Sequence, residues 1–374
     1  MIYLDYSATT PVREEVIDTY SSVCRDFIGN PNSLHSLGVK AKQLIDASTK
    51  QIADILGVKV SEVIYTSGAS EANNLAIKGV CSRYENRGHH IITTELEHSS
   101  IIAPLNYLSS KGFDVSFVKL DENGQVDLKN LEELIRDDTI LVSICSVNSE
   151  VGICQDLEKI SKVIRKKNPK TIFHSDVTQS IGKMKINLSC LDMASMSCQK
   201  FYGMKGIGAL IKKESLVIDP LIHGGKSTTI FRSGTPATPL IASFAKALRL
   251  MYEDFDTKCE QVKEIHDYLL NQLKELDISI NSNSCCVNHV INISLNNIKS
   301  EVMLHALEEK DIFISTQTAC SVGDYSKAVY AVTKDKNRAS SSLRISLSYL
   351  TTKEEIDTFI ESFKECLKQL DFGR

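Results

Sequence analysis

Several features that mark membrane or exported proteins are absent from this chain. No apolar run approaches the ~18 residues of a membrane-spanning helix. The N-terminal residues, Met1 to Asp5, form neither the basic start nor the apolar stretch of a signal peptide. We therefore expect a cytoplasmic protein that makes no membrane contact.

An excess of charge of one sign is also absent. The 43 basic and 47 acidic residues give a net charge of -4, so the chain offers no overall field to nucleic acid or anionic lipid. We expect no direct nucleic-acid partner and favour a small-molecule or protein ligand. The 11 cysteines include no Cys-x-x-Cys pair. In a reducing compartment most cysteines are apolar core residues, and we predict no metal site.

The length and the apolar pattern predict two domains with an α/β architecture. A chain of 374 residues exceeds what one core usually fills. Short apolar runs alternate with helical patterns, which is typical of a mostly parallel sheet. Strands are expected at 63–66, 91–94, 115–118, 140–145, 172–174, 193–196 and 207–211.

The second half of the chain has a different sequence pattern. Residues 236–276 form a long, mostly helical pattern that can bridge to a second domain. Residues 319–342 are polar and rich in small side chains, which predicts a long mobile loop. We place a large cofactor-binding domain at 12–250 and a smaller α+β domain, carrying that loop, at 1–11 and 251–374.

The segment Ser-Cys-Gln-Lys at 197–200 is the centre of the functional prediction. Lys200 follows a short apolar run and precedes several glycines, so its ammonium is fixed at a strand end with little bulk around it. A Schiff-base lysine needs such a place, although a surface lysine in a turn is the commoner explanation of this stretch alone. Ser197 and Lys200 also match Ser-x-x-Lys of penicillin-recognising enzymes. The Ser-Asp-Asn and Lys-Thr-Gly motifs that those enzymes need are absent.

Four further segments place polar groups at expected strand ends or loops. The sequence 66–71 opens a helix that could cradle an anion, and Asp176 could pair with a protonated ring nitrogen. His98 could stack on a ring and move protons, and Cys320 is the most accessible candidate nucleophile. Each signal alone has an ordinary structural explanation. An anion cradle, an acid, an imidazole and a lysine together are what a pyridoxal phosphate pocket requires.

A set of motifs along the chain strengthens this interpretation. They are Tyr-Leu-Asp-Tyr-Ser-Ala-Thr-Thr-Pro (3–11), Gly-Asn-Pro (29–31), Thr-Ser-Gly-Ala (66–69), Asn-Asn-Leu-Ala-Ile-Lys-Gly (73–79), Glu-His (97–98), Asp-x-Thr-Gln-Ser (176–180), Gly-Ile-Gly-Ala-Leu (206–210), His-Gly-Gly (223–225), Arg-Ser-Gly-Thr (232–235) and Ala-Cys (319–320). With these motifs the chain resembles, along nearly its whole length, the cysteine desulfurases of the NifS/IscS type. These are class V aminotransferase-like pyridoxal phosphate enzymes of fold type I, which implies a mostly parallel seven-stranded sheet and a smaller α+β domain.

The resemblance implies a role for each matching residue around the cofactor ring. Lys200 would hold pyridoxal 5'-phosphate as a Schiff base, and Asp176 would pair with the pyridinium. Gln179 would touch the phenolic oxygen, and His98 would stack on the ring and shuttle protons. Cys320 would attack the sulfur of the bound cysteine, leaving alanine and a protein persulfide.

The resemblance also implies the phosphate contacts. Ala69, Ser70 and Ser197 would bind the phosphate, and Thr235 would reach in from the other subunit of a homodimer. Gln199 stands where the family usually has a histidine, next to that phosphate.

The substrate would be held by Asn148 and Arg344, the latter through a bidentate fork that fits a carboxylate. The spacing of Cys320 and Arg344 resembles the long-loop group, whose cysteine can swing out to a partner. Residues 146–150 and 226–230 depart from the family pattern. Because Arg374 follows soon after the last expected helix, we expect the chain to lack the tail with which housekeeping members bind the iron-sulfur scaffold.

We predict a homodimeric cysteine desulfurase that converts L-cysteine to L-alanine and passes sulfur to a protein acceptor. The acceptor is left open between an iron-sulfur scaffold, a tRNA-thiolation protein and a dedicated partner. Two alternatives remain at this point. Another class V enzyme, a transaminase or a β-lyase, would use Lys200 without Cys320. A catalytically weak sulfur-relay partner is conceivable because of the altered motifs.

Overall fold

The computed structural model describes residues 1–296, 298–316 and 325–371. Its larger lobe is built on a seven-stranded sheet in the order β2-β8-β7-β6-β5-β3-β4. Every neighbouring pair is parallel except the two that involve β8, which confirms the predicted mostly parallel sheet. The strands are β2 (Val63–Thr66), β3 (His90–Thr93), β4 (Asp114–Phe117), β5 (Thr139–Ser143), β6 (Ile172–Asp176), β7 (Met193–Ser197) and β8 (Gly208–Lys212).

Helices cover both faces of this sheet because its inner strands are apolar on both sides. Successive strand residues point to opposite faces. Leu141 and Ile172 pack on one face with residues of α3 and α4, whereas Val142 and Phe173 pack on the other with residues of α2, α6 and α7. The covering helices are α2 (Ser36–Leu56), α3 (Ala69–Tyr84), α4 (Ser99–Ser109), α6 (Leu157–Lys167) and α7 (Thr238–Tyr252).

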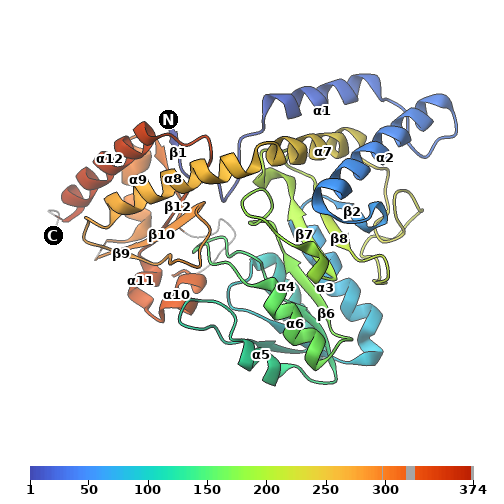
Figure 1. The fold of residues 1–374 in the computed structure, drawn as a ribbon, viewed down its shortest axis with the longest axis horizontal. Coiled ribbons are helices and arrows are strands. Elements are labelled where there is room, and N and C mark those ends of the chain that lie inside the picture. Colours follow the sequence, from blue (N-terminus) through green and yellow to red (C-terminus); the bar gives the residue numbers. More distant parts are fainter. Residues whose placement is uncertain (297, 317–324, 372–374) are drawn as a thin grey trace.

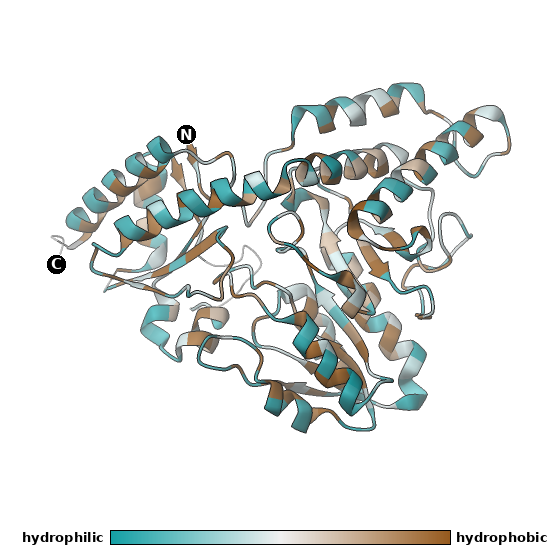
Figure 2. Cartoon of the chain, in the orientation of Figure 1, coloured by the Kyte–Doolittle hydropathy of each residue, from teal (hydrophilic) through white to brown (hydrophobic). Residues whose placement is uncertain are grey.

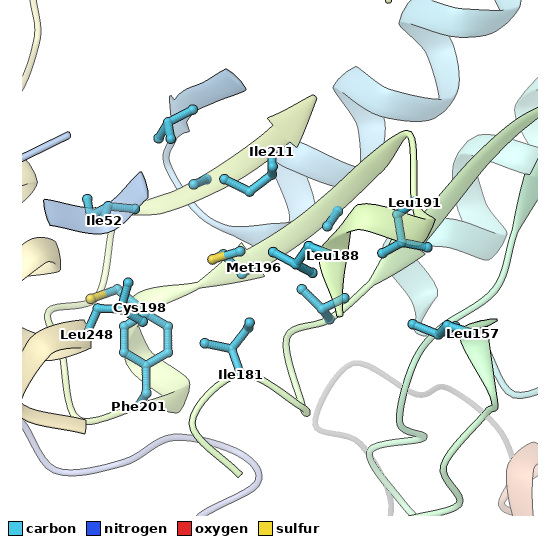
Figure 3. Packing of buried hydrophobic residues seen from close by; sticks show 14 of the residues in the cluster. Ile52, Leu157, Ile181, Leu188, Leu191, Met196, Cys198, Phe201, Ile211 and Leu248 are labelled. Carbon is cyan, nitrogen blue, oxygen red and sulfur yellow. The ribbon is translucent and has the colours of Figure 1, made fainter. Parts of the chain in front are cut away.

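The second of these two clusters is the larger core of the molecule. Figure 3 shows Met196 and Ile211 from neighbouring strands meeting Ile52 of α2 and Leu248 of α7. In Figure 2 the apolar colour is concentrated on the sheet and on the inward faces of the helices, while their outward faces are polar. The sheet is therefore held between two layers of helices, which also fixes the strand ends from which the loops begin.

The smaller lobe has its own apolar cluster. It contains a three-stranded sheet in the order β12-β10-β9 and a parallel pair formed by β1 and β11. Leu4 packs there beside side chains of α8, α9 and α12, so the N-terminus contributes to a core formed mostly by residues beyond 261. The elements are β1 (Ile2–Tyr3), β9 (Ile278–Ile280), β10 (Val290–Leu295), β11 (Ile312–Phe313), β12 (Ser342–Ser346), α8 (Phe255–Leu273), α9 (Ser300–Glu308) and α12 (Lys353–Asp371).

The remaining helices are α1 (Glu14–Asp26), α5 (Leu128–Leu134), α10 (Lys327–Thr333) and α11 (Lys336–Ser340). In Figure 1 the consecutive helices α7 and α8 run from the larger lobe to the smaller one. The domain boundaries at residues 11 and 250 stay a prediction. Among the described residues, no helix has the length and apolar character needed to cross a membrane.

Two sequence-based expectations about local structure need correction. The helical pattern at 236–276 is two helices, because Asp254 has a φ of 52° and a left-handed residue cannot continue a right-handed helix. The loop expected at 319–342 is wrong for its second half, where α10 and α11 form. Ser326 and Asp335 cap these helices, and Val329 packs into an apolar cluster. Residues 319–324 lie outside the described part of the chain.

Gly208 allows a test of the close approach between β8 and the loop before α3. A Cβ at this position would lie 2.4 Å from the Met196 carbonyl oxygen and 2.7 Å from the Gly68 Cα. Both are backbone atoms, so Gly208→Ala is expected to lower the free energy of unfolding by about 1–3 kcal/mol.

The matched control is Gly225→Ala, since nothing lies within 4 Å of a Cβ built there. This variant is expected to stay within ~0.5 kcal/mol of wild type in urea unfolding. Equal stability of the two variants would show that Gly68 and Gly208 are not in close contact.

Candidate active site

A cavity of about 390 Å³ lies at the carboxyl ends of the parallel strands. Its wall includes Asp176, the last residue of β6, and Ser197, the last residue of β7. Loops after parallel strands meet at one edge of a sheet, which is where ligands bind in such folds. The predicted site residues that line this cavity are Ala69, Ser70, His98, Asp176, Gln179, Ser197, Gln199, Lys200 and Arg344.

A second, larger cavity of about 880 Å³ lies in the smaller lobe. Serines and other polar residues form most of its wall, and none of the predicted site residues that the structure describes borders it. The smaller cavity is therefore the candidate active site.

Lys200 follows β7 directly, at the end of a short 3-10 turn formed by Cys198–Lys200. Its Nζ donates to the carbonyl oxygens of Ser7 and Ala8, both at 2.6 Å. Residues before and after Lys200 are held by the same N-terminal segment. The Thr10 hydroxyl donates to the Gln199 carbonyl oxygen and accepts from the Tyr202 amide. The N-terminal segment thus fixes the position of the lysine.

Asp176 is a buried carboxylate with both oxygens occupied. Oδ2 accepts from Asn73 Nδ2 at 2.8 Å, and Oδ1 accepts from the Thr178 amide at 3.0 Å. Asn73 also donates to the Ser100 hydroxyl at 2.9 Å, which ties α3, α4 and β6 together at the cavity. Such hydrogen bonds hold a carboxylate in one orientation.

His98 caps the N-terminus of α4. Its Nδ1 accepts from the Ser100 amide at 3.1 Å, which assigns the neutral ring with the proton on Nε2. Burial lowers the pKa of His98, and Lys200 lowers it further, whereas Asp176 acts in the opposite direction. The ring therefore offers Nε2–H as its donor.

The N-terminus of α3 opens into the cavity at Ala69 and Ser70. Gly68, the residue before this helix, provides no side-chain cap. A Cβ at Gly208 would lie 2.7 Å from the Gly68 Cα, so residue 208 has no room for a side chain, and Ser197 Oγ lies 3.6 Å from a Cβ built at Gly68. Uncapped amides and the helix dipole favour an anion at this place.

Gln179 is fixed from both sides of its amide. Nε2 donates to the Ser7 carbonyl oxygen at 2.9 Å, and Oε1 accepts from the Lys183 ammonium nitrogen. Burial lowers the pKa of Lys183 well below its ordinary range, and the nearby Lys200 and Arg344 act in the same direction. The amide therefore presents its NH2 group on the side of Ser7, a cavity-lining residue.

Two of the predicted residues that the structure describes do not line the cavity, and a third lies outside the described part of the chain. Asn148 does not line it, because its side chain is engaged with the loop that contains it and with the Leu96 carbonyl oxygen. Its neighbour Ser149 does line the cavity. Thr235 also lies outside this wall, and its predicted place is the site of a partner subunit. Cys320 lies outside the described residues. The roles of all three stay predictions.

Sequence reasoning gave no role to several residues that contact the predicted ones. These are Asp5, Ser7, Ala8, Asn73 and Lys183. Four of them lie in the motifs at 3–11 and 73–79, which indicate the family resemblance without assigning a role to these residues. Their positions in those motifs were the available signal.

Glu97 carries a buried carboxyl group beside the site, although part of the residue is exposed. Oε1 accepts from Thr94 and from the Cys145 amide, whereas the buried Oε2 has no hydrogen-bond partner among the described residues. Burial raises the pKa of Glu97 to about 8 from its ordinary value of 4.5. The unfolded chain releases this proton near pH 4.5 and the folded protein near pH 8. The contribution of Glu97 to stability is therefore full below pH 4.5 and is lost as the pH rises to 8.

Glu97→Gln cannot titrate and keeps the carbonyl acceptor. We expect it to stabilise the protein relative to wild type by about 2–4 kcal/mol more at pH 8 than at pH 5. Urea unfolding at the two pH values measures this. Glu95→Gln, at an exposed position two residues away, is the control and should show no such difference. A pH-independent effect of Glu97→Gln would contradict the raised pKa.

Comparison with known proteins identifies the family of this chain. Residues 2–359 match the family model of aminotransferase class-V. The chain is 38% identical over 381 residues to a cysteine desulfurase IscS of Histophilus somni (strain 2336), covering 99% of this chain and 93% of that relative.

Two solved structures show the same fold. A NifS-like protein superposes with a TM-score of 0.93 at 34% identity, covering 99% of both chains. A structure described as SspA in complex with cysteine superposes with a TM-score of 0.83 at 31% identity, covering 94% of this chain and 100% of that one. The chain belongs to the class V aminotransferase family and, within it, to the cysteine desulfurases of the NifS/IscS type.

Proposed function

We propose that this protein is a cysteine desulfurase that converts L-cysteine to L-alanine and keeps the sulfur as a persulfide on Cys320. The observation that carries the proposal is the convergence of Lys200, Asp176 and Arg344 on one cavity. The family implies pyridoxal 5'-phosphate as cofactor. The solved relative in complex with cysteine supports cysteine as the substrate.

The cavity has the groups that this cofactor needs. The uncapped start of α3, beside Ser197, suits a phosphate, and Gly208 has no side chain where its backbone approaches Gly68. Asp176, held by Asn73, suits a protonated ring nitrogen, and Gln179 suits an oxygen acceptor. Lys200 lies at the same strand end. These residues would hold the cofactor, with Thr235 of a partner subunit at the phosphate.

When bound, pyridoxal phosphate supplies an electron sink that weakens the bonds around the α-carbon of an amino acid. The other tasks belong to the chain. Lys200 would provide the amine that holds the cofactor and would exchange protons at Nζ. His98 holds a proton at Nε2, and its lowered pKa keeps the ring neutral. Asp176, whose carboxylate is held by Asn73 and the Thr178 amide, would pair with the protonated ring nitrogen. Arg344 binds the substrate carboxylate through its guanidinium fork.

Cys320 then takes the sulfur atom. In balance, L-cysteine and the Cys320 thiol become L-alanine and a Cys320 persulfide, with one carbon–sulfur bond broken and one sulfur–sulfur bond formed. Ser315, which precedes Cys320 in the sequence, forms a β-bridge with Arg344. The segment that carries Cys320 therefore begins beside the substrate-binding arginine. A sulfur acceptor protein, a homodimer and a cytoplasmic location complete the proposal.

The function is tested by L-alanine production from L-cysteine. Wild-type protein reconstituted with cofactor should release alanine in proportion to sulfur, and Lys200→Ala should lose at least ~100-fold in kcat because it lacks the amine. Cys320→Ser should bind L-cysteine, seen as a change in cofactor absorbance, and deliver no sulfur.

Cys24→Ser is the matched control, because Cys24 is an exposed cysteine in α1. It should behave as wild type. Alanine formation at the wild-type rate by Cys320→Ser would assign the sulfur to another group. Keto-acid product from wild type would indicate a transaminase or a β-lyase instead.

Gln199 permits a separate test of the phosphate site. A protonated imidazole beside a phosphate gives a hydrogen bond stronger by about 1 kcal/mol than a neutral amide does, or roughly fivefold in affinity. We expect Gln199→His to bind pyridoxal phosphate more tightly, with a larger gain at pH 6 than at pH 8. Equilibrium dialysis at both pH values measures this. Equal affinities of the two proteins would show that residue 199 does not face the phosphate.

A further inference from the structure

The backbone of Arg344 is held on both sides. It lies in β12, where it pairs with Asn292 of β10 and forms a bridge with Ser315. The residue is 1% exposed, which is rare for an arginine. Its Cα is therefore fixed, and only the side-chain torsions decide where the guanidinium points.

Two contacts fix those torsions. Nη2 lies 2.6 Å from Asp5 Oδ1, and Nη1 donates to the Ser149 carbonyl oxygen at 3.1 Å. An arginine has five N–H groups, and these contacts use two of them. The buried Nε has no partner among the described residues. The plane of the guanidinium is thus set, while donors remain for a ligand.

Asp5 is itself anchored to the strand that carries Arg344. It forms a parallel bridge with Ser346, two residues beyond Arg344 on β12, so Arg344 and Ser346 point to the same face of that strand. The preceding Leu4 donates to Phe313 at 2.8 Å and accepts from the Ser346 amide at 2.8 Å. Arg344 lines the cavity, whereas Asp5 does not. Asp5 therefore acts on the arginine from outside the cavity.

We propose that Asp5 is a positioning residue that presets the guanidinium of Arg344 for the substrate carboxylate. This inference rests on the proposed function, since it takes Arg344 as the carboxylate-binding residue. A bidentate pair needs the guanidinium and the carboxylate in one plane, and an arginine that is free to rotate loses side-chain entropy when it binds. Asp5 holds the fork in one orientation before the substrate arrives.

Simple charge compensation by Asp5 predicts the opposite effect. If Asp5 only neutralised a buried cation, its removal would leave Arg344 with more uncompensated charge, and anionic ligands would bind more tightly. Positioning predicts weaker binding when Asp5 is removed. The sign of the change in affinity therefore separates the two explanations.

The experiment uses the holoenzyme and two ligands that differ only in the carboxylate. L-Alanine carries it and undergoes no desulfuration, and ethylamine lacks it. Their dissociation constants are measured from the change in cofactor absorbance for wild type, Asp5→Ala, Asp5→Asn, Arg344→Ala and the double variant Asp5→Ala/Arg344→Ala. Thermal unfolding of each variant reports folding.

We expect Asp5→Ala to weaken L-alanine binding at least ~10-fold and to leave ethylamine within ~2-fold of wild type. Asp5→Asn keeps an oxygen acceptor in the same place and should stay within ~3-fold for both ligands. In the Arg344→Ala background, Asp5→Ala should have no further effect on L-alanine. The Michaelis constant for L-cysteine should rise in Asp5→Ala with little change in kcat.

Unchanged or tighter L-alanine binding in Asp5→Ala would overturn the proposal. So would equal losses for L-alanine and ethylamine, or an Asp5→Ala effect that persists without Arg344. Failure of the proposed function has a different signature, because wild-type protein would then form no alanine from L-cysteine. In protein that binds the cofactor, the comparison of L-alanine with ethylamine decides on Asp5 whether or not alanine is formed from L-cysteine.

Discussion

The contact between Lys200 and the N-terminal segment is the interaction on which the site depends. The lysine ammonium is held by the carbonyl oxygens of Ser7 and Ala8, and the Ser7 carbonyl also accepts from Gln179. Two residues before Ser7, Asp5 holds Arg344. A few consecutive residues thus place Lys200 relative to Arg344, which comes from the other lobe. The first residues of the chain connect two otherwise separate parts of the site.

The sheet makes this arrangement possible. Its apolar strands are packed between two layers of helices, so the ends of β6 and β7 have fixed positions. Polar groups at those ends can then be held by hydrogen bonds with little cost, as Asn73 and Thr178 hold Asp176. Glu97 Oε2 has no hydrogen-bond partner among the described residues, and Lys183 is buried. Both lower the stability of the fold, and the apolar packing must offset this loss of free energy.

Much of the fold followed from the sequence because the strands are short apolar runs between turns. The same pattern could not show that Asp254 breaks a helix or that α10 and α11 form after Ser326, since both depend on local caps and tertiary packing. Motifs that follow a strand predicted site residues such as Asp176 and Lys200, and the structure places these two residues in the wall of one cavity. The partnership of Asp5 with Arg344 was not predicted, because it joins residues 339 positions apart and no local pattern encodes such a contact.

We propose above all that Cys320 carries the sulfur atom taken from L-cysteine. Mass spectrometry of the cofactor-loaded protein after one exposure to L-cysteine tests this most directly, with peptides mapped after the persulfide is alkylated. The account predicts one additional sulfur atom on the peptide that contains Cys320, and none on that peptide in Lys200→Ala. An unmodified Cys320 in protein that has formed alanine, or a persulfide on another cysteine, would contradict it.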